Sequence, residues 1–523
     1  MVFIKKLART KKLDFYLIVF LILIGLFFRL WKLKNFQYWS DDEQLLWYTI
    51  RHIIVDGHPS LVVVNTALGV SLGSIYHLLI SPWYYLTKLN PQLILLLGNV
   101  FSLASILAIY KAGNLLGGKK IAFIASFLYS ASFISALFDR RLWALTPNFL
   151  VTTLSIIALL GLLSKKKKYI YLLLPAFVLP FNSDPSLLVP LISSIIAIIL
   201  LKIQLNRKHL IIFITSLFIL LSPLLIFEIR NKGQNLKSIK QLISTVKPVV
   251  KRNTNSLFLV DQFDYFSRFI YSRPSKASEI YFCYCRIDDN KNILPIFFST
   301  TVIAFFIYKS IKTKNKKDIV LTIFLVTYVL AVYIFKTILS RNSEFFYSIV
   351  ISPVIFLILA KFLSEKSKVI ITLFLLIYLS LNLNSLLNSE IKYKLKEKLK
   401  LAEEITKQVN PNENFSLYYS GDIFLAGGGW TSLFTYKGIT PTQGSLIKYW
   451  GHAYQSYGIY PKEFSQDASS KIVVLSENNI YKNFQNIRIE KIGNVYATII
   501  DNRKRLFSPE VNVEKLYIPK YFY

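Results

Sequence analysis

Long runs of apolar residues, separated by short basic segments, fill most of the chain. A membrane-spanning helix needs about 20 apolar residues in a row, and this chain holds about a dozen runs that approach that length. The candidate spans lie at roughly 13–31, 73–89, 93–112, 119–138, 143–163, 169–182, 185–203, 209–228, 291–310, 318–338, 345–363 and 367–387. The pattern predicts a mainly α-helical protein that crosses a membrane many times. It excludes a soluble enzyme and a protein with a single membrane anchor.

The last quarter of the chain has a different pattern. Residues 391–409 have helical periodicity and mixed charges. Short runs typical of strands follow at Phe415–Tyr419, Lys471–Leu475 and Asn494–Ile500. We therefore expect two domains, a membrane domain over residues 1–389 and a small α/β domain over residues 390–523. The glycines at 427–429 do not have the spacing of a nucleotide-binding loop.

The composition supports a membrane protein and indicates which kinds of partner to expect. Hydrophobic residues make up 53% of the 523 residues and charged residues 17%, against about 25% charged in an average soluble domain. The net charge is +33, from 62 Lys and Arg against 29 Asp and Glu. The lysines cluster between apolar runs, where positive charge sets membrane orientation and contacts anionic lipid. We expect membrane lipids as partners and no nucleic acid.

The basic clusters orient the predicted helices. The clusters that we assign to the cytoplasm are the N-terminal lysines, Lys165–Lys168, Lys202 with Arg207 and Lys208, Lys312–Lys317, and Lys361 with Lys366. A first loop at 32–72, a second loop at 229–290 and the C-terminal domain then lie outside. Twelve crossings would return the C-terminus to the cytoplasm, so one apolar run is expected not to cross.

The segment 73–89 is the run that we expect to stay at the membrane surface. It contains Pro82 followed by Trp83, Tyr84 and Tyr85, and such aromatic residues are typical of the membrane–water interface. About eleven crossings of the hydrocarbon core then remain. The prediction is a multi-pass cell-membrane protein with a cytoplasmic N-terminus and an external C-terminal domain.

Three adjacent carboxylates, Asp41, Asp42 and Glu43, follow the first predicted span closely. One interpretation is a helix through Asp56 that begins here, with Ser40 or Asp41 as its N-cap and acidic residues in its first turn. The other is a general base, because apolar rings nearby raise the proton affinity of a carboxylate. The two interpretations are compatible, since a capped helix is a rigid mount for a catalytic group.

An ordered set of motifs resembles a known family. The residues that carry it are Arg29, the pair Asp42-Glu43, the run Gly73–Leu79 with Ser81-Pro82, Arg140 with Trp143 and Pro147, Ser222–Arg230, and Phe346-Tyr347 with Pro353. The set covers roughly residues 10–390. It resembles the GT-C glycosyltransferases, and within them the protein O-mannosyltransferases and bacterial aminoarabinose transferases (glycosyltransferase family 39-like).

The resemblance implies an activity and a base. It implies inverting transfer of a single sugar from a polyprenyl-phosphate donor to an acceptor hydroxyl on a glycan, lipid or protein, with no metal and no cofactor. The implied base is Asp42, with Glu43 in support and Asp41 as the alternative. A lipid-linked donor keeps its tail in the bilayer and its sugar at the surface, where these residues are expected.

The departing phosphate of such a donor needs cations where charge develops. Arginine suits phosphate oxygens because its planar fork donates two hydrogen bonds. Arg140 and Arg141 are the first candidates, and Arg230 and Arg51 follow. Anchoring of lipid headgroups explains the same arginines equally well.

Three further residues are candidates for substrate binding. Trp39 could stack on a sugar face, and Tyr76 belongs to the segment that resembles the family. Asp184 precedes Pro185, so it fits an N-cap better than a ligand of a sugar hydroxyl.

The histidines His52, His58 and His77 fit surface positions better than a metal site. Aromatic residues between Trp430 and Tyr460 fit a sugar-binding face or packing at the membrane interface equally well.

Two other functions remain open from the sequence. A transporter or flippase of lipid-linked glycans predicts charged residues near span centres and broken helices, whereas the notable charges here lie at span ends. A non-catalytic scaffold would present the C-terminal domain without requiring carboxylates beside the first span.

Overall fold

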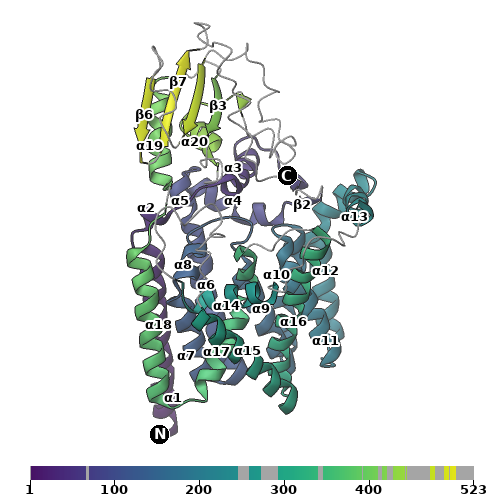
Figure 1. Cartoon of the computed structure of the whole chain (residues 1–523). Helices are drawn as coiled ribbons and strands as arrows, with labels where there is room; N and C mark the ends of the chain where they lie inside the picture. The colour runs from purple at the N-terminus through teal and green to yellow at the C-terminus, as the bar shows by residue number, and fades with distance from the viewer. Residues whose placement is uncertain are drawn as a thin grey trace.

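The structure of the protein is a computed structural model. The described residues are 2–65, 70–245, 258–272, 293–339, 345–391, 393–409, 415–420, 428–441, 443–444, 471–476, 488–493 and 495–501. Figure 1 shows a bundle of helices with a sheet at one end and the start of the chain at the other.

Helices make up most of the described chain. Those of the first half are α1 (Val2–Leu30), α2 (Leu33–Phe36), α3 (Asp41–Ile54), α4 (Ile75–Leu86), α5 (Pro91–Ile94), α6 (Leu96–Gly117), α7 (Lys119–Ser130), α8 (Phe133–Asp139), α9 (Asn148–Leu163), α10 (Leu174–Val178), α11 (Leu188–Leu200), α12 (Arg207–Arg230) and α13 (Gln234–Thr245). Those of the second half are α14 (Phe258–Ile270), α15 (Ile293–Thr313), α16 (Lys316–Leu339), α17 (Ser352–Ser364), α18 (Lys368–Asn388), α19 (Leu395–Thr406) and α20 (Trp430–Tyr436). Short 3-10 helices are η1 (Lys167–Leu173), η2 (Leu179–Phe181), η3 (Pro185–Leu187) and η4 (Phe345–Val350).

Several helices are long and apolar enough to cross a membrane. In the described part of the chain, five helices meet this description by length and composition: Pro91–Gly117, Arg207–Arg230, Ile293–Thr313, Lys316–Phe335 and Lys368–Asn388. A bent pair, α7 with α8, adds a sixth if the pair counts as one span. The predicted helical, multi-span character is confirmed, and the number of crossings stays a prediction.

Two of the predicted spans are not single straight helices. The run 119–138 breaks into α7 and α8, which meet at 66°. The run 169–182 forms η1, α10 and η2, with Pro175 and Pro180 in it. Proline removes a backbone donor and blocks the helical geometry before it, so such a run cannot stay one regular helix.

The segment predicted to stay at the membrane surface contains α4. At 1.5 Å per residue, a helix of 12 residues is about 18 Å long, and the hydrocarbon core is about 30 Å thick. Figure 1 shows α3, α4 and α5 between the bundle and the sheet. The short length agrees with the expectation that this segment does not cross.

The sheet near the C-terminus has the order β4-β3-β5-β7-β6. Its strands are β3 (Phe415–Ser420), β4 (Gln443–Gly444), β5 (Lys471–Ser476), β6 (Arg488–Ile492) and β7 (Val495–Asp501). β3 runs parallel to β4 and β5, whereas β7 runs antiparallel to β5 and β6. The predicted strands and the predicted helix before them are confirmed. A separate hairpin joins β1 (Val62–Asn65) and β2 (Ser71–Gly73).

One buried apolar cluster continues from the bundle into the sheet region. It includes Phe28 of α1 and Tyr38 after α2, and it extends to Leu401 of α19, Phe415 of β3 and Trp430 of α20. The sheet and its helices are therefore packed onto the bundle end that carries α3, and this packing positions the site described next.

Candidate functional site

The three adjacent carboxylates lie in the first turn of α3, as predicted. Ser40 is the N-cap, and its hydroxyl accepts a hydrogen bond from the backbone N–H of Asp42 at 3.3 Å. The Glu43 carboxylate accepts one from the backbone N–H of Ser40 at 2.9 Å. This capping box satisfies donors that a helix end otherwise leaves free, and the acidic residues suit the positive end of the helix dipole.

Glu43 is fixed by Arg141, which the loop after α8 supplies. Arg141 Nε donates to Glu43 Oε1 at 2.7 Å, and Arg141 Nη2 donates to the Ser40 hydroxyl at 3.1 Å. The guanidinium lies 3.7 Å from the centre of the Trp143 ring. Both charged side chains are fully buried, and each satisfies the other, which a buried ion requires.

Asp42 differs from its neighbours because 37% of its side chain is exposed. Its carboxylate lies 3.7 Å from Arg141 Nη2. Burial by the surrounding protein raises the pKa of Asp42 to about 6, with Arg141 opposing and the charges of Glu43 and Asp184 adding to the rise. Near neutral pH, Asp42 is therefore a carboxylate that accepts a proton more readily than an ordinary aspartate.

Asp184 reaches the neighbourhood of Asp42 from another part of the chain. Its carboxylate accepts a hydrogen bond from the backbone N–H of Ser186 at 2.8 Å and caps η3, as predicted. Burial raises its pKa, and the bonds from Ser186 and Asn148 oppose that rise. Its negative charge raises the pKa of Asp42. Asp184 therefore both caps η3 and contributes to the electrostatics of the site.

Asp41 faces the sheet region instead. It is buried, and its carboxylate accepts a hydrogen bond from the backbone N–H of Gly429 at 2.8 Å. Burial raises the pKa of Asp41 to about 7, and the bond from Gly429 opposes this. Asp41 therefore connects α3 to the loop before α20, whereas Asp42 is the carboxylate that solvent reaches.

Lys398 of α19 completes this contact, and no sequence pattern indicated it. Its ammonium donates to the carbonyl oxygens of Trp39 and Gly428, each at 2.9 Å. Burial lowers its pKa to about 7, and the charge of Asp41 opposes that shift. A Cβ atom on Gly428 would lie 2.2 Å from Asp41 Oδ1. The absence of a side chain at Gly428 therefore allows the loop before α20 to approach the Asp41 carboxylate closely.

The predicted aromatic ligands lie in packed surroundings. Trp39 is fully buried, and its indole N–H donates to the Ser432 hydroxyl at 3.0 Å, so its ring has no free face for a sugar. Tyr76 is buried on α4 and donates to the carbonyl of Trp143 at 3.0 Å. Trp430 is also buried. Residues 445–470, which hold most of the other predicted aromatic ligands, lie outside the described residues.

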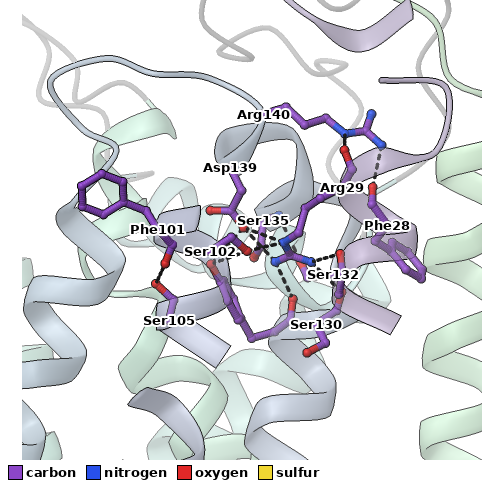
Figure 2. Close-up of polar contacts among 12 residues, drawn as sticks. Phe28, Arg29, Phe101, Ser102, Ser105, Ser130, Ser132, Ser135, Asp139 and Arg140 are labelled. Carbon is purple, nitrogen blue, oxygen red and sulfur yellow. Dashed lines mark hydrogen bonds and ion pairs between the residues drawn. The ribbon is translucent and has the colours of Figure 1, made fainter. Parts of the chain in front are cut away.

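The predicted arginines do not act together. Arg140 Nε donates to the carbonyl of Arg29 at 3.0 Å, and Arg140 Nη2 donates to the carbonyl of Phe28 at 2.5 Å (Figure 2). Arg140 thus satisfies carbonyls at the end of α1. Arg230 is exposed at the end of α12, and Arg51 lies at the far end of α3 beside Asp56. Only Arg141 reaches the carboxylates.

A buried ion pair below the site was missed by the sequence analysis. Arg29 and Asp139 approach to 2.7 Å, and the Tyr129 hydroxyl donates to the same carboxylate oxygen at 2.9 Å. Arg29 also donates to the carbonyl of Ser130 at 2.7 Å (Figure 2). The sequence signal for this pair was the presence of Arg29 and Asp139 in apolar runs, because a charged residue in such a run needs a partner of opposite charge.

The stretch Asp139–Arg141, at the end of α8, therefore joins α8 to α1 and α3. Asp139 pairs with Arg29 of α1, Arg140 caps the end of α1, and Arg141 holds Glu43 of α3. Since each of these charges is buried, loss of one partner would leave another unpaired. The arrangement fixes α3, and with it Asp42, relative to the bundle.

The histidines do not form a metal site with other residues in the described ranges. Among those ranges, no group of three or more His, Cys, Asp and Glu side chains is close enough to hold a metal ion. His52 pairs with Asp56 at 2.9 Å, and its ring centre lies 5.5 Å from that of His58. His77 is buried on α4, and burial lowers its pKa to about 3.

Comparisons with known proteins find similarity in structure but not in sequence. No protein-family model matches the chain, and no curated protein matches it by sequence. The structure of ArnT from Cupriavidus metallidurans in the apo state is similar, with a TM-score of 0.63 at 9% identity, covering 96% of this chain and 100% of that chain. The same protein bound to undecaprenyl phosphate gives a TM-score of 0.62 at 9% identity, covering 95% and 99%.

The similarity extends over most of the chain. A match to 96% of the chain is too long to leave out either the bundle or the C-terminal sheet, so the two proteins have similar overall folds. The resemblance to the aminoarabinose transferases that the sequence motifs indicate is thereby confirmed at the level of the fold.

Proposed function

We propose that this protein is an inverting glycosyltransferase. It would transfer a single sugar from a polyprenyl-phosphate donor to an acceptor hydroxyl at the outer membrane–water interface. The observation that carries the proposal is the environment of Asp42, a partly exposed carboxylate with a raised pKa on a rigidly held helix. The ArnT-like fold supports the donor class, because one of the matching structures contains undecaprenyl phosphate.

In the proposed reaction, Asp42 accepts the proton of the acceptor hydroxyl. The acceptor oxygen then bonds to the anomeric carbon while the bond from that carbon to the phosphate oxygen breaks. Attack from the face opposite the leaving group inverts the configuration. The products are the glycosylated acceptor and polyprenyl phosphate, and no step is assigned to a metal ion or cofactor.

Glu43 and Arg141 have supporting roles in this proposal. Glu43 orients Arg141 through a 2.7 Å hydrogen bond, and Arg141 lies 3.7 Å from Asp42. The positive charge of Arg141 keeps Asp42 ionised and favours the negative charge that develops on the departing phosphate. Among the predicted arginines we retain Arg141 for this role, because the described contacts of Arg140 are to carbonyls of α1.

We also propose how the chain is arranged in the membrane. The membrane domain covers residues 1–389 and crosses the bilayer about eleven times, each crossing needing roughly 20 apolar residues. The domain over residues 390–523 lies outside with the loops at 32–72 and 229–290. This arrangement puts Asp42 at the outer surface, where a lipid-linked sugar and an external acceptor can meet.

The test compares Asp42→Asn with Asp56→Asn, a matched change at the other end of the same helix. Purified proteins receive labelled polyprenyl-phosphate sugars and membrane acceptors. Loss of a general base lowers the rate by about 100-fold or more, so Asp42→Asn should lose transfer while Asp56→Asn retains it. Asp42→Asn should keep the unmodified melting temperature, since the Asp42 side chain makes no cap bond of α3.

Three outcomes would contradict the proposal. Equal turnover by the unmodified protein and Asp42→Asn would remove Asp42 as the base. Failure of the unmodified protein to transfer any sugar across a broad panel of donors and acceptors would favour a non-catalytic protein. Retention of the starting anomeric configuration in the product would refute inversion.

A further inference from the structure

Helix α13 begins directly after a helix that is suited to the bilayer. The most apolar 18 residues of α12 carry few charges, and only 6% of them are buried within the protein. Only the three residues Asn231–Gly233 separate the two helices, and Gly233 has a φ of +73° that permits the turn. Because the connection is so short, α13 must lie close to the surface of any membrane that α12 crosses.

The exposed side chains of α13 are of two kinds. Leu236 is 70% exposed and Ile239 is 42% exposed. Lys237 and Lys240 are exposed on the same helix, and Lys232 is exposed in the turn before it. A short helix with large apolar side chains beside lysines is typical of segments that lie in the membrane–water interface.

The orientation of α13 is fixed by Asn235. Its side-chain amide donates to the carbonyl of Ser71 at 2.9 Å, and its side-chain oxygen accepts from the backbone N–H of Ser71 at 2.7 Å. Its own backbone N–H donates to Glu228 Oε1 at 3.1 Å. These contacts hold one side of α13 against β2 and the end of α12, so Leu236 and Ile239 stay exposed on the other sides.

We propose that α13 is a docking element for the surface of an anionic bilayer. Leu236 and Ile239 enter the boundary between headgroups and acyl chains, and Lys232, Lys237 and Lys240 contact lipid phosphates. Two features favour lipid over a protein partner. The helix continues from a span whose own surface is exposed and apolar, and its charged residues all have the sign that anionic headgroups attract.

The test measures depth in the membrane and needs no enzymatic activity. An environment-sensitive fluorophore is attached to Leu236→Cys or, as the control on the polar side, to Gln241→Cys. The background carries Cys283→Ser and Cys285→Ser, and the protein is reconstituted in lipid nanodiscs. Spin-labelled lipid should quench the fluorophore at position 236 strongly and at position 241 weakly. Equal quenching at both positions, or none at 236, would overturn the proposal.

A second arm tests the lipid charge. Spin-labelled phosphatidylglycerol should quench position 236 more than spin-labelled phosphatidylcholine at the same mole fraction, since each nearby lysine enriches anionic lipid about fivefold. The preference should disappear in the triple variant of Lys232, Lys237 and Lys240 to Gln. It should persist when three exposed lysines of the α19 region, Lys396, Lys400 and Lys407, are changed to Gln. Protection of position 236 from both lipid and aqueous quenchers would show that protein covers it, and would refute docking to lipid.

Discussion

Three consecutive carboxylates differ in their contacts and in their exposure to solvent. Asp41 is buried against Gly429 of the sheet region, and Glu43 is buried against Arg141 of the bundle. Asp42 also lies near Arg141, at 3.7 Å, but it keeps 37% of its side chain exposed to solvent. One helical turn therefore contains two carboxylates with structural contacts and one that is available for proton transfer. The difference arises from contacts with residues that are far away in the sequence.

At the scale of the residue, the raised pKa of Asp42 predicts the pH dependence of transfer. A protonated Asp42 cannot accept the acceptor proton, so activity should rise with pH through a midpoint of about 6. Asp184→Asn removes a negative charge that raises this pKa, so the midpoint should move to lower pH. Asparagine can still accept the bond from Ser186, so the cap of η3 should persist. The measurement is the pH profile of kcat/KM.

Asp56→Asn is the control for that shift. It removes the same charge from the distant end of α3, so its pH profile should coincide with that of the unmodified protein. An unchanged midpoint in Asp184→Asn would mean that Asp184 does not act on Asp42. A midpoint that moves to higher pH would contradict the sign of the proposed interaction.

At the scale of the element, the contact between α3 and the loop before α20 predicts unequal effects of two glycine substitutions. Gly429 and Gly438 have φ values of +73° and +98°, so alanine is strained at both, by about 1–2 kcal/mol. A Cβ atom on Gly429 would also lie 2.6 Å from Trp39 Cδ1, whereas none would meet an atom within 4 Å at Gly438. Gly429→Ala should therefore destabilise by about 1–3 kcal/mol more, the usual effect of overpacking.

The midpoint of thermal unfolding in detergent checks this prediction. Gly438→Ala measures the backbone strain alone, and the difference between the two variants measures the close approach of the loop to α3. Equal midpoints would mean that the loop before α20 does not pack against Trp39. A lower midpoint for Gly438→Ala would contradict the close approach outright.

Elements with local signals were predictable, and the break between α7 and α8 was not. The start of α3 is set by Ser40 and Glu43, which are three residues apart, so the sequence shows it directly. The break after Ser130 lies in a continuous apolar run. Its free backbone groups bond to distant partners, since Arg29 donates to the Ser130 carbonyl and Phe133 donates its N–H to Asn382. No pattern within the run reveals those partners.

The same difference applies to the candidate site. The position of Asp42 in the first turn of a helix was predictable, because Ser40 and Glu43 mark the helix start. The choice between Arg140 and Arg141 was not predictable, since adjacent residues have the same sequence context. The structure separates them by where their side chains go, one to carbonyls of α1 and the other to Glu43 of α3. The position of the residues after α8, beside the end of α1 and the start of α3, determines this.

At the scale of the whole molecule, contacts gather several basic segments at one end. Lys119 pairs with Asp14 at 2.7 Å, and Lys120 donates to the carbonyl of Ser364 at 2.6 Å. Lys317 donates to the carbonyl of Leu115 at 2.6 Å. Asp14 lies within α1, and the other residues lie at the ends of α6 and α17 and at the starts of α7 and α16. Figure 1 shows this end of the bundle opposite the sheet. Positive charge collected at one end favours a cytoplasmic position for that end.

This arrangement predicts opposite labelling of two exposed lysine positions. Lys314 lies between α15 and α16 at the basic end, and Lys400 lies on α19 beside the sheet. In a chain with Cys283→Ser and Cys285→Ser, a membrane-impermeant maleimide added to intact cells should label Lys400→Cys and leave Lys314→Cys unlabelled. Inverted membrane vesicles should give the reverse result, because the two ends of the bundle then exchange sides. Labelling of both positions from the same side would refute the proposed arrangement, and it would also move Asp42 away from the external surface, since α3 packs against the sheet region through Asp41 and Gly429.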